Sequence, residues 1–117
     1  SFEPLEALRY IHFLKPDGRL VYNKISINRS TVAAGLAIYP QDVEEQIAAA
    51  CTEAHGIDAL SIARQAGNGK AVNMVMVGTV MKYLPLKEEI ITEVVKQISK
   101  GKGVDVNMRA LAGGAAA

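Results

Sequence analysis

Apolar residues recur at helical spacing in several stretches of the chain. Residues 4–14 and 43–55 each have an apolar stripe at every third or fourth position. Residues 71–84 are apolar on nearly every helical face, so this helix should be central and covered from several sides. Further helices are predicted from residue 87 onward and over 104–111. The helix from residue 87 is amphipathic, with an expected inner face of Ile90, Ile91, Val94, Val95 and Ile98.

Two short β-prone stretches lie between these helices. Residues 19–23 have no polar alternation in their middle, which is typical of a strand covered on both faces in a parallel sheet. Residues 57–62 predict a second strand, while 24–30 read as irregular or extended and 31–37 as a short helix or a strand. Helix, turn and strand in succession form half of a βαβ unit. We therefore expect a strand upstream of residue 4, and read the chain as part of a longer one.

Proline, glycine and capping residues mark the expected helix ends. Pro4 suits a first helical turn, and Asp42 with Glu45 has the spacing of an acidic capping box. Gly56 is predicted to end the helix over 43–55. Residues 113–117 are expected to form a flexible tail, which leaves residues 1–112 as a single domain.

The segment Ala66-Gly67-Asn68-Gly69 is the strongest helix breaker in the sequence. It reads either as a plain turn between elements or as a phosphate-binding loop ahead of a helix. Neither the P-loop spacing nor GxGxxG is present, which favours the plain turn. The phosphate interpretation would make the protein a stand-alone Rossmann-like nucleotide-binding module, and this is the alternative function.

Few side chains have the type and spacing that catalysis requires. Cys51, the only cysteine, reads as a small buried filler, although His55 follows it at i+4 on the same predicted helical face. No carboxylate cluster accompanies His12 or His55, so the sequence assigns no catalytic residue and no metal site. Asn73 stands near the start of a helix expected to be buried. Its amide must therefore bond a neighbouring backbone group, or face a ligand or partner.

The overall composition excludes several classes of partner. Thirteen Lys and Arg residues stand against 12 Asp and Glu, and Trp is absent. This balance gives no electrostatic case for binding nucleic acid or an anionic membrane. No run of 18 apolar residues and no signal peptide are found, so we expect a cytoplasmic protein. A single cysteine also cannot hold an iron–sulfur cluster without other chains.

Short motifs follow one another along the whole chain. They are Phe2-Glu3-Pro4-Leu5-Glu6-Ala7-Leu8-Arg9-Tyr10, Leu14-Lys15-Pro16-Asp17-Gly18, Leu20-Val21-Tyr22-Asn23, Tyr39-Pro40, Asn73-Met74-Val75-Met76-Val77-Gly78, Leu84-Pro85-Leu86 with Glu88-Glu89, and Asn107 with Ala110 and Gly113. In this order they resemble the gamma subunits of 2-oxoacid:ferredoxin oxidoreductases, closest to the indolepyruvate and pyruvate types. The resemblance covers the C-terminal two-thirds of that family. The family's N-terminal glycine-rich turn has no counterpart in this chain.

The resemblance implies a helix-rich, Rossmann-like layered α/β fold with a mainly parallel sheet, whose N-terminal βα unit is missing from this chain. It implies a role in thiamine diphosphate-dependent oxidative decarboxylation of a 2-oxoacid to an acyl-CoA. Iron–sulfur clusters pass the electrons to ferredoxin, and the cofactors belong mainly to other subunits or domains. The chain is then not catalytic alone and binds no cofactor by itself. Asn23, Asn28 and Asn73 are the candidates for lining a site or an interface.

Overall fold

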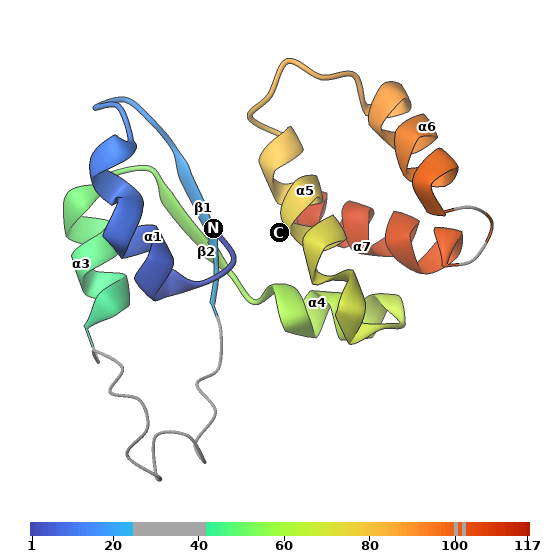
Figure 1. The fold of residues 1–117 in the computed structure, drawn as a ribbon, viewed down its shortest axis with the longest axis horizontal. Helices are drawn as coiled ribbons and strands as arrows, with labels where there is room; N and C mark the ends of the chain where they lie inside the picture. The colour runs from blue at the N-terminus through green and yellow to red at the C-terminus, as the bar shows by residue number, and fades with distance from the viewer. Residues whose placement is uncertain (25–41, 100, 102) are drawn as a thin grey trace, which may run out of the picture. The chain divides into compact units, whose positions relative to one another are not determined.

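The computed structural model describes residues 1–24, 42–99, 101 and 103–117 (Figure 1). Its residues divide into two compact units, Ser1–Ile57 and Asp58–Ala117. The first unit contains α1 (Pro4–Tyr10), the 3₁₀ helix η1 (Ile11–Phe13), β1 (Leu20–Asn23), α3 (Val43–Ala50) and β2 (Ala54–Ile57). The second contains α4 (Ala59–Ala66), the 3₁₀ helix η2 (Gly69–Ala71), α5 (Val72–Met81), α6 (Glu88–Ser99) and α7 (Val104–Ala116). The helix-rich α/β class expected from the sequence is confirmed. The expected single domain over 1–112 stays a prediction.

The two strands of the first unit form a parallel pair. Their register runs from Leu20 opposite Ala54 to Asn23 opposite Ile57. Three of the four residues of β1 are buried, as a strand covered on both faces should be. The parallel sheet predicted from the unbroken apolar run at 19–23 is thereby confirmed.

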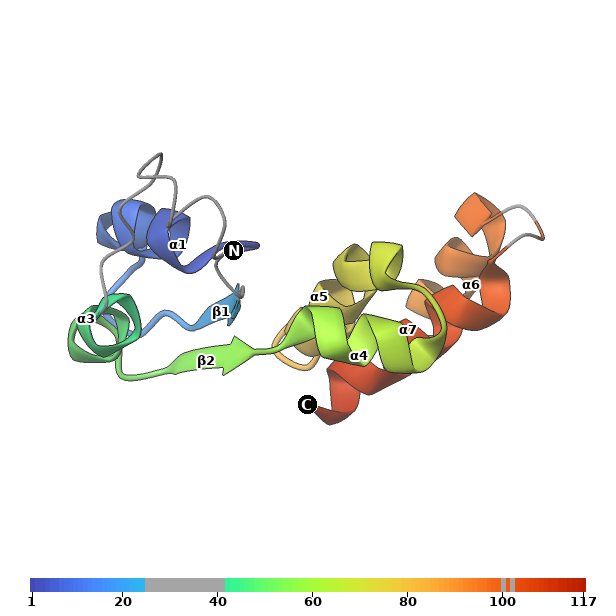
Figure 2. The same cartoon turned by 90° about the horizontal axis from the view of Figure 1, so that it is seen from below.

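The core of the first unit lies between this sheet and two helices. Tyr22 from β1 packs with Ala7 from α1 and with Val43 and Ile47 from α3. Figure 2 shows α1 and α3 on the same side of the strands. Ile47 has no exposed surface, and Tyr22 is 5% exposed. These side chains bury apolar area, which holds the two helices on one face of the sheet.

The first helix begins as the sequence predicts, with Pro4 in its first turn. The carboxylate of Glu3 accepts hydrogen bonds from the backbone N–H groups of Leu5 (3.0 Å) and Glu6 (2.8 Å). These bonds satisfy donors that the helix leaves free. The prediction for α3 is only half right. The helix does begin after Asp42, but among the described residues the Asp42 side chain makes no capping hydrogen bond.

The segment around Gly56 differs from the expected helix end. The helix stops at Ala50, and Ala54–Ile57 forms β2 instead. Gly56 lies opposite Tyr22 in the sheet, and an added Cβ there would come within 2.7 Å of the Tyr22 ring. Glycine is therefore required here to make room for a core side chain, and it does not end the helix. The strand predicted over 57–62 is also wrong, because the helix α4 begins at Ala59.

Asp58 is the N-cap residue of α4. Its carboxylate accepts hydrogen bonds from the Ser61 N–H (3.1 Å) and the Ser61 hydroxyl (2.7 Å). These bonds favour the charged form, so they lower the pKa of Asp58 from its ordinary value of 3.8. A carboxylate whose pKa is lowered by folding stabilises the fold above that ordinary value. This contribution is lost as the pH falls below it.

Asp58→Ala should therefore lower the free energy of unfolding by about 1 kcal/mol at neutral pH, because a helix cap is lost. Asp58→Asn is the matched control, since its amide oxygen still accepts a capping bond. Urea unfolding followed by circular dichroism, at neutral pH and at successive values below 3.8, measures both variants. The gap between wild type and Asp58→Ala should narrow with falling pH. A gap that is the same at every pH would contradict the assigned cause.

The helices α5 and α7 make the closest contact of the second unit. Gly78 of α5 lies against the backbone of Leu111, and Gly114 of α7 lies against the backbone of Val75. Two glycines that face opposite backbones let the helix axes come close, and α5 and α7 meet here without side chains between them. The last helix continues to Ala116 and buries Gly114. A short helix was expected over 104–111, followed by a flexible tail. The structure has one longer helix over both segments.

Candidate functional site

Asn23 is the first of the three asparagines proposed from the sequence. It is 6% exposed and stands at the carboxyl end of β1. Its backbone N–H donates to the Ser1 carbonyl (2.9 Å), and its Nδ2 donates to the Phe2 carbonyl (3.4 Å). Asn23 therefore fastens the start of the chain to β1. Both bonds join it to the protein's own backbone.

Lys24 and Tyr22 add charge and a hydroxyl at the same end of β1. The Lys24 Nζ lies 3.6 Å from a Glu44 carboxylate oxygen. Burial raises the pKa of the Tyr22 hydroxyl, and the negative charge of Glu44 raises it further. Ligands of open parallel sheets bind outside the carboxyl ends of the strands. This rule predicts that a ligand of the first unit would bind near Tyr22, Asn23 and Lys24, and this placement stays a prediction.

Asn28 and Asn73 were also proposed from the sequence. Asn73 is exposed on α5, so the prediction that it is a buried amide is wrong. Asn28 lies outside the described residues. The buried polar group of α5 is Thr79, which the sequence analysis missed. Its hydroxyl approaches the carbonyls of Val75 (3.0 Å) and Gly114 (2.9 Å), and so fastens α5 to α7.

Thr79 is completely buried. A hydroxyl has a single hydrogen, so it can be shared between these two carbonyls but cannot fully satisfy both. Threonine in a helix commonly bonds the carbonyl four residues earlier, which here belongs to Val75. The signal available in the sequence was a lone hydroxyl within a run of apolar residues. The helix itself is also less enclosed than expected, since Val77 is 44% exposed.

The Gly67–Gly69 segment forms a turn in which the N–H groups of Gly67 and Asn68 already have partners. Gly67 has a φ of +124°, and the N–H groups of Gly67 and Asn68 donate to the Ala63 carbonyl (3.2 and 3.1 Å). The Asn68 side chain accepts from the Lys70 N–H (2.9 Å). A phosphate loop needs free N–H groups directed at the ligand. The turn instead ends α4, as glycine at this position commonly does.

The same turn is held from α7. Nε of Arg109 donates to the carbonyl of Ala66, the last residue of α4, at 2.9 Å. This cation thus satisfies a carbonyl that the end of the helix leaves free. Arg109 is engaged with the protein's own backbone at the place where the alternative function would require an anion site.

Cys51 and His55 do not share a helical face, because α3 ends at Ala50 and His55 lies in β2. The Cys51 thiol is buried, with its sulfur 3.8 Å from the Gly18 carbonyl oxygen. This placement agrees with the small buried filler expected from the sequence. Within the described residues, no three His, Cys, Asp or Glu side chains are grouped to hold a metal ion.

The second unit carries an exposed apolar surface on α6. Only Val95 of the expected inner face is buried. Ile90, Val94 and Ile98 are 58%, 48% and 60% exposed. These three residues, spaced four apart on one face, are called the α6 stripe. The prediction that all five apolar residues turn inward is therefore wrong, since α6 packs on α7 through only one edge of its wide apolar face.

Tyr83, Leu84 and Leu86, which precede α6, are also exposed. Exposed apolar side chains of this size, where they gather, are characteristic of a binding surface for another protein. Among the described residues, no helix is both long and apolar enough to cross a membrane. Because they are large and exposed, the apolar side chains of α6 and of the segment before it are interpreted as a candidate interface.

Comparison with known proteins decides the family. The profile described as pyruvate ferredoxin/flavodoxin oxidoreductase matches residues 1–117. The chain belongs to this family. No solved structure matches the chain at the significance required.

Three curated relatives show which members of this oxidoreductase family the chain is similar to. The chain is 40% identical over 118 residues to the indolepyruvate oxidoreductase subunit IorB of Thermococcus kodakarensis. It is also 40% identical over 116 residues to the subunit of that name in Pyrococcus horikoshii, and 33% identical over 115 residues to the one in Archaeoglobus fulgidus. Each alignment covers 94–95% of this chain but 57% of the relative. The chain thus spans little more than half the length of these relatives.

Membership in the family raises the question of which cofactors these residues fit. An iron–sulfur cluster needs several cysteine thiolates, commonly four. This chain offers only Cys51, whose sulfur is buried beside the Gly18 carbonyl. The residues of this chain therefore do not fit a cluster of their own.

Proposed function

We propose that this chain is a segment of the gamma-type subunit of a 2-oxoacid:ferredoxin oxidoreductase, of the indolepyruvate or pyruvate type. The observation that carries the proposal is the family match over the whole chain, together with relatives named as subunits of indolepyruvate oxidoreductase. The assembled enzyme decarboxylates a 2-oxoacid on thiamine diphosphate. It transfers the acyl group to coenzyme A and the electrons, through iron–sulfur clusters, to ferredoxin. We place this reaction in the cytoplasm.

Within that enzyme the chain serves to build and shape the assembly and is not catalytic alone. Its conspicuous polar groups support this role, because they bond the protein's own backbone. Thr79 and Arg109 fasten α7 to the rest of the second unit. Asn23 fastens the start of the first unit. Such buried and half-buried groups stabilise a specific packing arrangement, which suits a subunit that positions other parts of an enzyme.

The α6 stripe is the surface that we assign to a neighbouring subunit of the same enzyme. Its three side chains remain about half exposed although each is large and apolar. Removing such side chains from water contributes about 25 cal/mol per Å² of apolar area. Polar residues of α6, including Glu93 and Gln97, border the stripe. An apolar centre with a polar border is the usual composition of a protein interface.

Val94→Lys tests this assignment, because it places a charge in the middle of the stripe. In the full-length subunit, co-expressed with its partner subunits, the substitution should reduce co-purification at least tenfold, which corresponds to about 1.4 kcal/mol. Gln97→Lys is the matched control, since it adds the same charge on the same helix at an exposed polar position. It should leave co-purification unchanged. Each variant subunit, purified without its partners, should have a melting temperature close to that of the wild type, as measured by circular dichroism.

Three results would count against the assignment. Equal co-purification of Val94→Lys and wild type would show that the stripe does not contact a partner subunit. Loss of co-purification in Gln97→Lys as well would show that any added charge on α6 disturbs assembly, whether or not it lies in the stripe. A large fall in the melting temperature of isolated Val94→Lys would assign the stripe to the subunit's own fold instead.

A further inference from the structure

Three cations surround the turn that follows α4, where α4 ends beside α7 (Figure 2). Arg64 comes from the last turn of α4, Lys70 from η2 and Arg109 from α7. A Cβ added at Gly67 would lie 3.3 Å from Nη2 of Arg109, and one added at Gly69 would lie 3.9 Å from Nε of Arg64. Lys70 follows Gly69 directly, and all three cations are exposed. Arg64, Lys70 and Arg109 are together called the basic turn.

The cations of the basic turn have no carboxylate partner among the described residues, unlike those of the first unit. Each Lys and Arg that the structure describes in the first unit lies 3.2–3.8 Å from a carboxylate oxygen; the four are Arg9, Lys15, Arg19 and Lys24. The acidic residues of the elements around the turn are Asp58, at the opposite end of α4, and Asp105, one turn before Arg109 on α7. Positive charge therefore prevails at the turn.

The fold itself accounts for only part of this cluster. A cation near the end of α4 is favoured by the helix dipole, and Nε of Arg109 bonds the Ala66 carbonyl (2.9 Å). The Lys70 ammonium and the two Nη groups of Arg109 donate to none of the described residues. The Nε bond holds the guanidinium in place, so its Nη groups can pair with a carboxylate at a small loss of side-chain entropy.

The exposed position of the basic turn fits the surface of a protein better than a small anion. Small-molecule sites are concave and enclose most of the ligand, whereas Gly67 and Asn68 are exposed within this turn. The N–H groups of Gly67, Asn68 and Lys70 already bond acceptors of the same chain, so these groups cannot cradle a phosphate.

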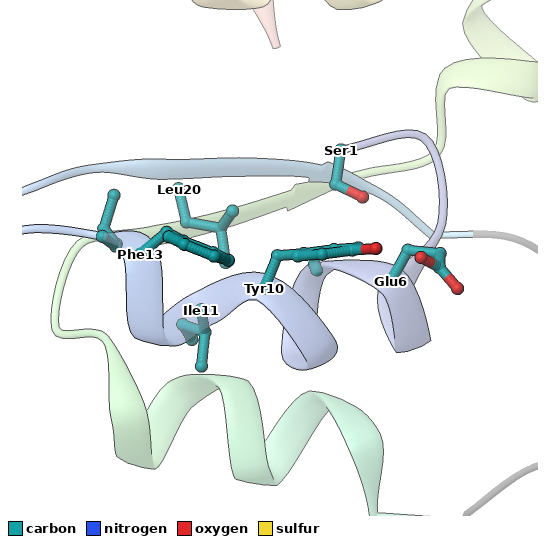
Figure 3. Close-up of a pocket in the computed structure, with 8 residues that line it drawn as sticks. Ser1, Glu6, Tyr10, Ile11, Phe13 and Leu20 are labelled. Carbon is teal, nitrogen blue, oxygen red and sulfur yellow. The ribbon is translucent and has the colours of Figure 1, made fainter.

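The pocket in Figure 3 gives an anion no better place. It lies in the first unit, has a volume of about 340 Å³ and is lined mainly by apolar side chains, among them Tyr10, Phe13 and Leu20. Its charged side chain is that of Glu6, which repels an anion. Negative charge is therefore received best at the basic turn, where three cations of the described residues gather without carboxylate partners.

We propose that the basic turn binds an acidic segment of a neighbouring subunit of the same enzyme. This inference rests on the proposed function, in which the chain is assembled with other subunits, and it adds a second contact made by elements other than α6. Exposed ion pairs contribute little to affinity, but they raise the rate of association and fix the orientation of the partners. The α6 stripe then supplies apolar burial, and the basic turn supplies the electrostatic attraction that directs assembly.

Zero-length coupling with a carbodiimide tests the contact in the assembled complex of full-length subunits. The reagent joins a lysine amine to a carboxylate only when the two are in contact, and mass spectrometry identifies the joined residues. Lys70 should be coupled to Asp or Glu residues of a partner subunit. Lys96 is the internal control, because it is exposed on α6 but about 200° around the helix from Val94. It should give much less product coupled to a partner.

Charge reversal at Lys70 provides a second measurement. Lys70→Glu should slow the association of the full-length subunit with its partners about fivefold or more at about 0.1 M salt, because attraction becomes repulsion. The difference should shrink at about 1 M salt, where the screening length falls from about 10 Å to about 3 Å. Lys96→Glu is the matched control, since it makes the same change in net charge, and it should associate at the wild-type rate. Both variants should keep the melting temperature of the wild type.

Four results would overturn this proposal alone. Equal association rates for Lys70→Glu and wild type, or an equal loss in Lys96→Glu, would show that the basic turn does not direct assembly. Coupling of Lys70 only to its own subunit would show that it does not contact a partner. Micromolar binding of inorganic pyrophosphate that Lys70→Glu abolishes would assign the turn to a small phosphate ligand. In each case the subunits still form a complex, so the proposed function stands; failure of the wild-type subunits to assemble would remove both.

Discussion

Gly78→Ala is expected to lower the free energy of unfolding by about 2 kcal/mol or more. An added Cβ at Gly78 would meet the carbonyl of Leu111, and one at Gly114 would meet the carbonyl of Val75. Backbone atoms of packed helices cannot turn aside as a side chain can, so the helices must separate. Overpacking of this kind typically costs 1–3 kcal/mol and occasionally more. The substitution also gains about 1 kcal/mol of helix propensity, so any observed loss understates the cost of the clash.

Gly113→Ala is the matched control for this prediction. It lies in the same helix beside Gly114, but an added Cβ there would meet the Cγ2 methyl of Ile62 (2.7 Å) and no backbone atom. A side chain can shift more readily than a backbone, so Gly113→Ala should cost clearly less than Gly78→Ala or Gly114→Ala. Urea unfolding followed by far-ultraviolet circular dichroism compares Gly78→Ala, Gly114→Ala and Gly113→Ala with wild type. If Gly78→Ala and Gly114→Ala are as stable as Gly113→Ala, then α5 and α7 do not touch through these glycines.

Ile47→Ala is expected to be equally damaging in the first unit. Ile47 is fully buried between α1, α3 and β1, where it packs with Ala7 and Tyr22. Truncation of a buried Ile removes apolar contact and leaves a cavity, at a cost of 2–5 kcal/mol. The tight surroundings of Tyr22, already limited by Gly56, leave little room for the core to collapse into the space. The same unfolding experiment measures this loss.

Gln46→Ala is its control on the neighbouring position of α3. Gln46 is exposed, and alanine is at least as good a helix former, so its free energy of unfolding should change by less than about 0.5 kcal/mol. A loss of similar size in both variants would indicate that α3 is weakened as a helix. A loss confined to Ile47→Ala would place the effect in the core beneath it.

The period and content of apolar residues predicted most of the helices and the parallel strand. The stripe at 4–14 and the run at 19–23 became α1 with η1, and β1. Gly78 was the informative position in α5, because a glycine inside a helix is costly unless another backbone packs closely against it. That close approach is found at Leu111. The local pattern was sufficient where the secondary structure of a segment depends mainly on that segment's own residues.

The errors arose where tertiary pairing overrode a local signal. The residues around Gly56 read as a helix end, because glycine after an alanine-rich helix usually is one. The deciding fact was the Tyr22 ring on a strand more than thirty residues away in the sequence. Likewise the period of α6 identified its apolar face, but not how much of that face α7 would cover. Pairing and coverage of this kind depend on residues far away in the sequence, so the local pattern does not predict them.

Prediction of site residues from the sequence was weaker than prediction of elements. Asn23, proposed to line a site or an interface, is buried at the end of β1, and that proposed role stays a prediction; Asn73 proved exposed and Thr79 was overlooked. An asparagine in an apolar run attracts attention because its amide is expensive to bury. A threonine is less conspicuous because its hydroxyl can bond within its own helix.

The central claim is that this chain is part of a 2-oxoacid:ferredoxin oxidoreductase. The chain helps to assemble that enzyme but does not catalyse the reaction alone. The most direct test expresses the full-length subunit with and without its partner subunits, and follows reduction of ferredoxin by indolepyruvate or pyruvate in the presence of coenzyme A and thiamine diphosphate. The account predicts a stable complex that reduces ferredoxin, and no reduction by the full-length subunit alone. A full-length protein that purifies without any thiamine-dependent partner, and binds NAD or ATP tightly by itself, would contradict it.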